Sequence, residues 1–129
     1  MAVKWARWAI DNGVRAYLAH GLALDLDAAR LVKSTDQLVV GTGPDFLINK
    51  QRERLVRKTE FLPALLSLVP PSQIVFSTDY AWNVLDQSRP DKLDWNSKGR
   101  IIEACVSAGL DSDTIRQILH GNAVGFFGM

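Results

Sequence analysis

Hydrophobic and polar residues are arranged along the chain in short blocks that predict strands alternating with helices. Helices are expected where apolar residues recur every three or four positions, and strands where a short apolar run stops at glycine or polar residues. The helices are expected at 3–10, 25–33, 46–68, 95–108, 111–119 and 122–127. The strands are expected at 14–19, 38–40 and 74–76. Strands separated by helices favour parallel βαβ units, and three such strands leave two open sheet edges that invite pairing with another chain.

Two features of the expected helices have more than one interpretation. Either Asp25 or Asp27 caps the second helix, because both acids stand at its start. Pro63 either kinks the helix at 46–68 or begins a new one, because proline removes a backbone donor and crowds the preceding turn. The basic residues within 50–58 have a glutamate among them and no aromatic platform. We therefore interpret them as a solvated helix face rather than a nucleic-acid site.

Length, charge and cysteine content exclude several classes of protein. The chain has 129 residues, enough for one domain but about half of the roughly 250 that a complete (β/α)8 barrel needs. With 15 Lys and Arg against 14 Asp and Glu the net charge is +1, so no nucleic-acid or membrane partner is expected. The longest apolar stretch, Phe61–Val69, is too short to span a bilayer. A single cysteine, Cys105, and the lack of a secretory signal lead us to expect a reducing, cytoplasmic setting.

An acidic residue directly after a strand is the strongest candidate for chemistry. Asp79 follows the apolar run at 74–76, and parallel barrels keep their active sites at the carboxyl ends of the strands. A carboxylate held there can ligate a divalent cation and take a proton from a bound water. Its neighbours are candidates for the substrate pocket: Thr78, Tyr80 and Trp82. The alternative is that Asp79 merely caps the loop or the next helix.

Two blocks of sequence resemble the amidohydrolase-related family of metal-dependent hydrolases and decarboxylases. Residues 74–82 read IVFSTDYAW, where that family has patterns such as ILFSTDWPF or VILGTDYPF. Residues 118–128 read ILHGNAVGFFG, which resembles the family's closing ILxxNAxxLFG. The resemblance runs from Gln37 to Met129, and similar enzymes include aminocarboxymuconate-semialdehyde decarboxylase and γ-resorcylate decarboxylase. Ala81 departs from the pattern, because relatives usually have proline there, and this suggests a looser loop.

The resemblance implies an α/β fold: the last three βα units of a TIM-type (β/α)8 barrel, with parallel strands and a helix-rich C-terminus, as one domain over 1–129. It makes Asp79 the metal-facing, base-capable aspartate and Asn122 the N-cap of the closing helix. His20 resembles the histidine that ends the sixth strand and polarises the substrate or assists proton transfer; a surface or packed histidine is the alternative. Zinc or manganese is the ion implied. The family's His-x-His pair and fifth-strand histidine have no counterpart here, so a closed zinc site is not expected in this chain alone.

Two functions follow as expectations. The first is a metal-dependent hydrolase or decarboxylase, a fragment or truncated member of the amidohydrolase superfamily, acting on a small carboxylated or cyclic substrate. Its protein partner would be a second copy or a complementary N-terminal barrel half. The second is a catalytically silent α/β domain that oligomerises through its open sheet edges. We also expect the four tryptophans mainly to pack, Phe126 and Phe127 to contribute to stability if buried, and the glycine pair at 41–43 to form a turn.

Overall fold

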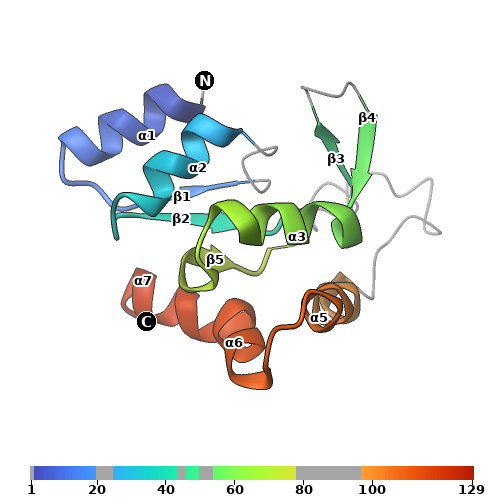
Figure 1. The fold of residues 1–129 in the computed structure, drawn as a ribbon. Helices are drawn as coiled ribbons and strands as arrows, with labels where there is room; N and C mark the ends of the chain where they lie inside the picture. Colours follow the sequence, from blue (N-terminus) through green and yellow to red (C-terminus); the bar gives the residue numbers. More distant parts are fainter. Residues whose placement is uncertain (1, 20–24, 44–45, 50–53, 78–96) are drawn as a thin grey trace, which may run out of the picture.

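The computed structural model shows a small parallel sheet with helices on both sides (Figure 1), and it describes residues 2–19, 25–43, 46–49, 54–77 and 97–129. In chain order the first elements are α1 (Ala2–Asp11), β1 (Ala16–Leu18), α2 (Leu26–Lys33), β2 (Leu38–Gly41), β3 (Phe46–Asn49), β4 (Arg54–Arg57) and α3 (Lys58–Leu68). They are followed by the 3-10 turn η2 (Pro71–Gln73), β5 (Ile74–Val75), α5 (Ser97–Ser107), α6 (Ser112–Arg116), the π-helical turn η4 (Gln117–Gly121) and α7 (Asn122–Phe127).

Three of the strands form a parallel sheet in the order β1-β2-β5. β1 pairs with β2 from Ala16↔Leu38 to Leu18↔Val40, and β2 pairs with β5 through Val40↔Ile74 and Gly41↔Val75. The predicted strands and their parallel direction are therefore confirmed, each somewhat shorter or shifted at its ends. The described part is a mixed α/β fold, and since three strands do not close a barrel, the (β/α)8 assignment stays a prediction.

A β-hairpin replaces the first half of the long helix expected at 46–68, and this part of the prediction is wrong. β3 and β4 pair antiparallel from Phe46↔Arg57 to Asn49↔Arg54, and the helix begins only at Lys58. The register sets two short apolar pairs opposite each other, Leu47–Ile48 and Leu55–Val56. Runs this short fit a strand as well as a helix, so periodicity alone could not decide between them.

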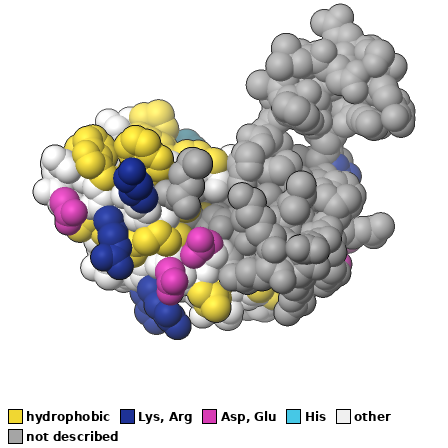
Figure 2. Space-filling model, turned by 90° about the horizontal axis from the view of Figure 1, so that it is seen from above, with side chains coloured by type: hydrophobic (Ala, Val, Ile, Leu, Met, Phe, Trp, Pro, Cys, Tyr) yellow, Lys and Arg dark blue, Asp and Glu magenta, His cyan; other side chains and the backbone are white. Residues whose placement is uncertain are grey.

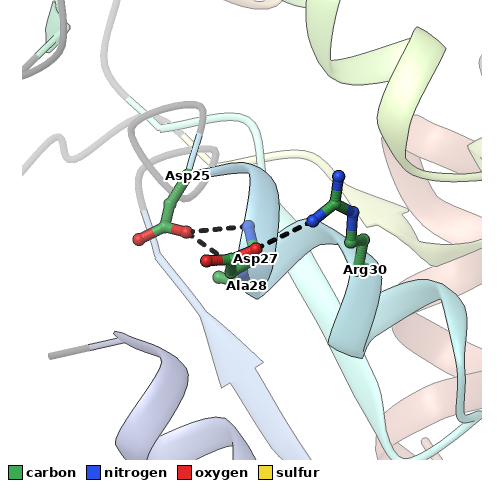
Figure 3. Close-up of polar contacts among 4 residues, drawn as sticks. All are labelled: Asp25, Asp27, Ala28 and Arg30. Carbon is green, nitrogen blue, oxygen red and sulfur yellow. Dashed lines mark hydrogen bonds and ion pairs between the residues drawn. The ribbon is translucent and has the colours of Figure 1, made fainter.

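The start of α2 resolves the question of which aspartate caps it. The Asp25 carboxylate accepts hydrogen bonds from the backbone N–H groups of Asp27 and Ala28, each at 3.0 Å (Figure 3). Asp27 lies in the first helical turn and forms an exposed ion pair with Arg30 at 3.0 Å. Asp25 is therefore the cap, and Asp27 places a negative charge near the positive end of the helix dipole.

The hydrophobic core lies on one face of the sheet, between the sheet and α1, α2, α3 and α5. Alternate strand residues point into it, including Leu38, Val40 and Ile74, all fully buried. Val69 and residues of the helices, α6 and η4 included, complete it: Ala6, Ala9, Ala28, Ala29, Val32, Leu62, Leu65, Ile101, Ala104, Cys105, Ile115 and Ile118. The alanines of α1 and α2 are small enough for the two helices to pack closely together.

The expectation that the tryptophans mainly pack is wrong for two of them. Trp5 and Trp8 are 57% and 51% exposed, so these two tryptophans are surface groups in edge-to-face contact rather than core packing groups. Val106 on α5 is likewise 60% exposed. Phe127 is 54% exposed, while Phe126 is half-buried with the Arg15 guanidinium 5.7 Å above its ring. Among the residues that the structure describes, no helix is long and apolar enough to cross a membrane.

Candidate functional site

The three parallel strands end at one edge of the sheet, which is where the predicted chemistry should lie. All five predicted site residues lie outside the described residues: Asp79, His20, Thr78, Tyr80 and Trp82. Their nearest described neighbours are Ala19, which follows β1, and Ser77, which follows β5. The roles of the five residues therefore stay predictions, and the site is built here from the groups around them.

Hydroxyl groups join the carboxyl ends of β2 and β5. Thr42 is fully buried, and its hydroxyl donates to the Ser77 carbonyl at 2.9 Å and accepts from the Ser77 N–H at 3.0 Å. The Ser77 hydroxyl accepts from the Gly43 N–H at 2.8 Å, and Gly43 adopts φ 65°, a left-handed conformation that favours glycine. The glycine pair was predicted to form a turn, but Gly41 is the last residue of β2, and residues 42–43 fix the end of the neighbouring strand.

A second hydroxyl, that of Tyr17, reaches the same place from β1. A Cβ atom built on Gly41 would collide with the Tyr17 hydroxyl, would lie 2.5 Å from Tyr17 Cζ and would lie 2.6 Å from Ser77 Oγ. The Tyr17 phenol therefore lies across Gly41, with its hydroxyl beside that of Ser77. Any side chain on Gly41 would separate the two groups.

The sequence reasoning missed these three residues. Tyr17 falls within the strand expected at 14–19 and Gly41 within the turn expected at 41–43, while Ser77 was assigned no role. The signal was present, because a strand that ends in glycine often marks a close approach of other atoms. What the sequence lacked was the register that sets Tyr17 opposite Val39 and so near Gly41, two residues further along β2.

Asn122, the asparagine of the second motif, acts at the opposite edge of the sheet. Its side-chain amide donates to the carbonyls of Pro71 and Ile74, both at 2.8 Å. The predicted N-cap role is wrong: Asn122 has helical backbone angles, and no side-chain cap bond is present at the start of α7. The helical path continues from α6 through the π turn η4 into α7, so no helix starts afresh at Asn122 and its amide is free to bind the chain entering β5.

The same edge carries an open pocket and a second side-chain amide that binds carbonyls. Gln73 Nε2 lies 2.8 Å from the Val32 carbonyl, 2.6 Å from that of Thr35 and 3.1 Å from that of Leu38, which joins the end of α2 to the start of β2. A pocket of about 600 Å³ is lined here by Arg15, Thr35, Asp36, Gln73, Asn122 and Phe126, among others. It lies at the amino ends of the strands, away from the predicted chemistry.

A metal site is not assembled within the described ranges. No group of three or more His, Cys, Asp and Glu side chains there is placed to hold an ion. The whole chain has two histidines and one cysteine. Cys105 is buried, and desolvation raises the pKa of its thiol, which disfavours the thiolate that metals bind. The residues that the structure describes therefore do not assemble a zinc site, and the expected ion belongs to the proposal below.

Comparison with known proteins adds no relative. No family model, no curated protein and no solved structure matches this chain. The resemblance therefore rests on two short blocks alone. Residues 74–82 begin with β5, and residues 118–128 contain Asn122.

Proposed function

We propose that this chain carries one side of the reaction centre of an amidohydrolase-type hydrolase or decarboxylase that acts on a small carboxylated or cyclic substrate. The observation that supports it is the pair of Asn122 hydrogen bonds. The two blocks that resemble the family are far apart in sequence, yet Asn122 of the second block binds the carbonyl of Ile74, the first residue of the first block. Because both blocks contact the same strand, β5, their resemblance to the family is better explained by common origin than by two chance matches.

The sheet supports the proposed place of the chemistry. Three parallel strands present their carboxyl ends at one edge, as barrel active sites require. In this proposal Asp79 is the metal ligand or base, and His20 after β1 assists at the substrate. The pocket walls are Thr78, Tyr80 and Trp82.

The proposal requires help from a second polypeptide. Zinc or manganese would supply polarisation of the substrate and an activated water, and one carboxylate with one histidine is too few protein ligands for either ion. A complementary barrel half or a second copy of this chain would contribute the rest and pair with the edge strands. The buried free thiol of Cys105 agrees with a reducing, cytoplasmic setting, which belongs to the same proposal.

A catalytically silent domain that oligomerises is the second candidate, and one observation favours it. Four of the exposed large hydrophobic residues belong to α1, β1 and the turn between them: Trp5, Trp8, Val14 and Tyr17. Aromatic residues of this kind are enriched at protein interfaces. Seen from above (Figure 2), the described part of the surface mixes hydrophobic, basic and acidic side chains, so no single charge dominates that face.

The deciding experiment measures metal content, oligomeric mass and turnover of the purified chain, alone and with any N-terminal barrel half that associates with it. Zinc or manganese bound in a complex, with CO2 release from hydroxybenzoates or hydrolysis of cyclic amides, supports the enzyme. Asp79→Asn should fold normally and abolish metal-dependent turnover, while the control Asp11→Asn, an exposed aspartate on α1, should not. Equal turnover and equal metal content in the two variants would refute the role of Asp79.

A further inference from the structure

Two hydroxyl groups at the carboxyl edge have hydrogens that no described residue accepts. The Tyr17 hydroxyl has no hydrogen-bond partner within the residues that the structure describes. Ser77 Oγ accepts from the Gly43 N–H, which occupies a lone pair and leaves the hydroxyl hydrogen to point elsewhere. Tyr17 is 37% exposed, so part of its side chain reaches the solvent.

The Tyr17 and Ser77 hydroxyls are brought together next to Gly41 by the arrangement of the strands. Tyr17 is on β1 and Ser77 follows β5, so they come from alternate strands of the sheet, with the glycine of β2 between them. Side chains from alternate strands share a layer in a parallel barrel, and the outermost layer at the carboxyl edge faces the substrate. Ser77 is held in place by three hydrogen bonds to the segment 42–43, so one donor of the pair is rigid.

We propose that the Tyr17 and Ser77 hydroxyls form a two-donor subsite for the carboxylate of a small cyclic acid. A carboxylate has two acceptor oxygens and can take one hydrogen from each hydroxyl. Neither donor carries a charge, and the Arg15 guanidinium is committed to the Phe126 carbonyl at the other edge of the sheet, so the subsite orients the acid more than it attracts it. Placing this subsite beside the reaction centre rests on the proposed function; the binding of a carboxylate does not.

Benzoate is the probe, and nuclear magnetic resonance of the full chain is the measurement. The Gly43 N–H bonds directly to Ser77 Oγ, so its resonance should shift as benzoate binds, whereas benzyl alcohol at equal concentration should leave it unchanged. Tyr17→Phe keeps the ring over Gly41 and removes one donor, and the dissociation constant for benzoate should rise about tenfold. Ser77→Ala should weaken binding similarly, while Ser67→Ala, which removes a hydroxyl that donates to the Ala64 carbonyl within α3, should not.

The outcomes separate this inference from the proposed function. Benzoate that fails to bind the wild-type chain, or binds it and Tyr17→Phe equally, overturns the subsite whatever Asp79 does. The subsite is supported if benzoate shifts the Gly43 N–H resonance and both variants weaken benzoate binding. This holds even if Asp79→Asn leaves metal content and turnover unchanged and the enzyme proposal falls. A preserved amide spectrum in Tyr17→Phe shows that lost binding is not lost folding.

Discussion

Asn122 offers the sharpest test of how this fold is held together. β5 has two residues and pairs with β2 through two positions only, so its ladder contributes little. The Asn122 amide adds two hydrogen bonds, to the carbonyls on either side of the turn that leads into the strand. Replacing Asn122 by alanine removes both bonds and leaves the surrounding chain unchanged.

The cost can be worked from the surroundings of the two carbonyls. A neutral hydrogen bond contributes about 1 kcal/mol, and an acceptor left dry costs more. Ile74 is fully buried, so water replaces its lost partner poorly, whereas Pro71 is partly exposed and water can reach it. We expect a loss of about 2 to 3 kcal/mol, offset by roughly 0.5 kcal/mol because alanine favours the helix more than asparagine does.

Urea unfolding followed by circular dichroism measures the effect. With a slope of about 1.5 kcal/mol per molar, a loss of about 2 kcal/mol lowers the midpoint by roughly 1.3 M. Asn122→Asp is nearly isosteric but sets a carboxylate against two carbonyl oxygens, so it should be at least as destabilising. Asn12→Ala is the matched control, because Asn12 is exposed and makes one bond to the Trp8 carbonyl within its own turn. If Asn122→Ala and Asn12→Ala lose the same stability to within about 0.5 kcal/mol, Asn122 does not hold β5.

Three further changes test other parts of the structure. Asp25→Ala removes the cap of α2 and should cost about 1 kcal/mol in the same urea assay, with Asp36→Ala, an exposed aspartate outside the helix, as the neutral control. Hydrogen bonds from the backbone and side chain of Thr114 lower the pKa of Asp111 below its ordinary value of 3.8, so its stabilising effect is complete above that pH and is lost as the pH falls through the lowered pKa. Asp111→Ala should therefore lose more stability relative to wild type at pH 7 than at pH 2, and an unchanged difference at both would contradict this. The Cys105 thiol, buried and with a raised pKa, should react with a thiol reagent at pH 7 only as fast as the chain unfolds; rapid labelling of the folded protein would be the contrary result.

The sequence predicted the sheet well because its strands have strong local signals. Leu38-Val39-Val40 is a short β-branched run closed by glycine, and Ile74-Val75 stands between two prolines and polar residues. The start of α2 was predicted to within two residues, because Asp25 and Asp27 are both residues that can cap a helix. Those signals are carried by neighbouring residues, so they can be read without knowing the rest of the fold.

The failures occurred where distant contacts decide the outcome. The hairpin of β3 and β4 depends on pairing between two apolar dipeptides that periodicity alone cannot distinguish from one face of a helix. Asn122 looked like a helix cap because its two acceptors lie 48 and 51 residues earlier in the chain. The Tyr17–Ser77 pair needed the register of three strands, and no local pattern encodes a register.

The two blocks that resemble the family support different conclusions, one about the fold and one about catalysis. The residues of the second block hold β5: Asn122 binds the carbonyls before and within it, and the Phe76 N–H donates to the Ile118 carbonyl at 2.9 Å. A family motif with such a role would persist in any member that keeps the strand, whether or not it retains chemistry. The second block therefore argues for the fold, and only the acid of the first block argues for catalysis. Asp79→Asn tests the proposed chemistry, and Asn122→Ala tests the structural role of the second block. A chain that is unaffected by Asp79→Asn but unfolds with Asn122→Ala would be a silent relative rather than an enzyme.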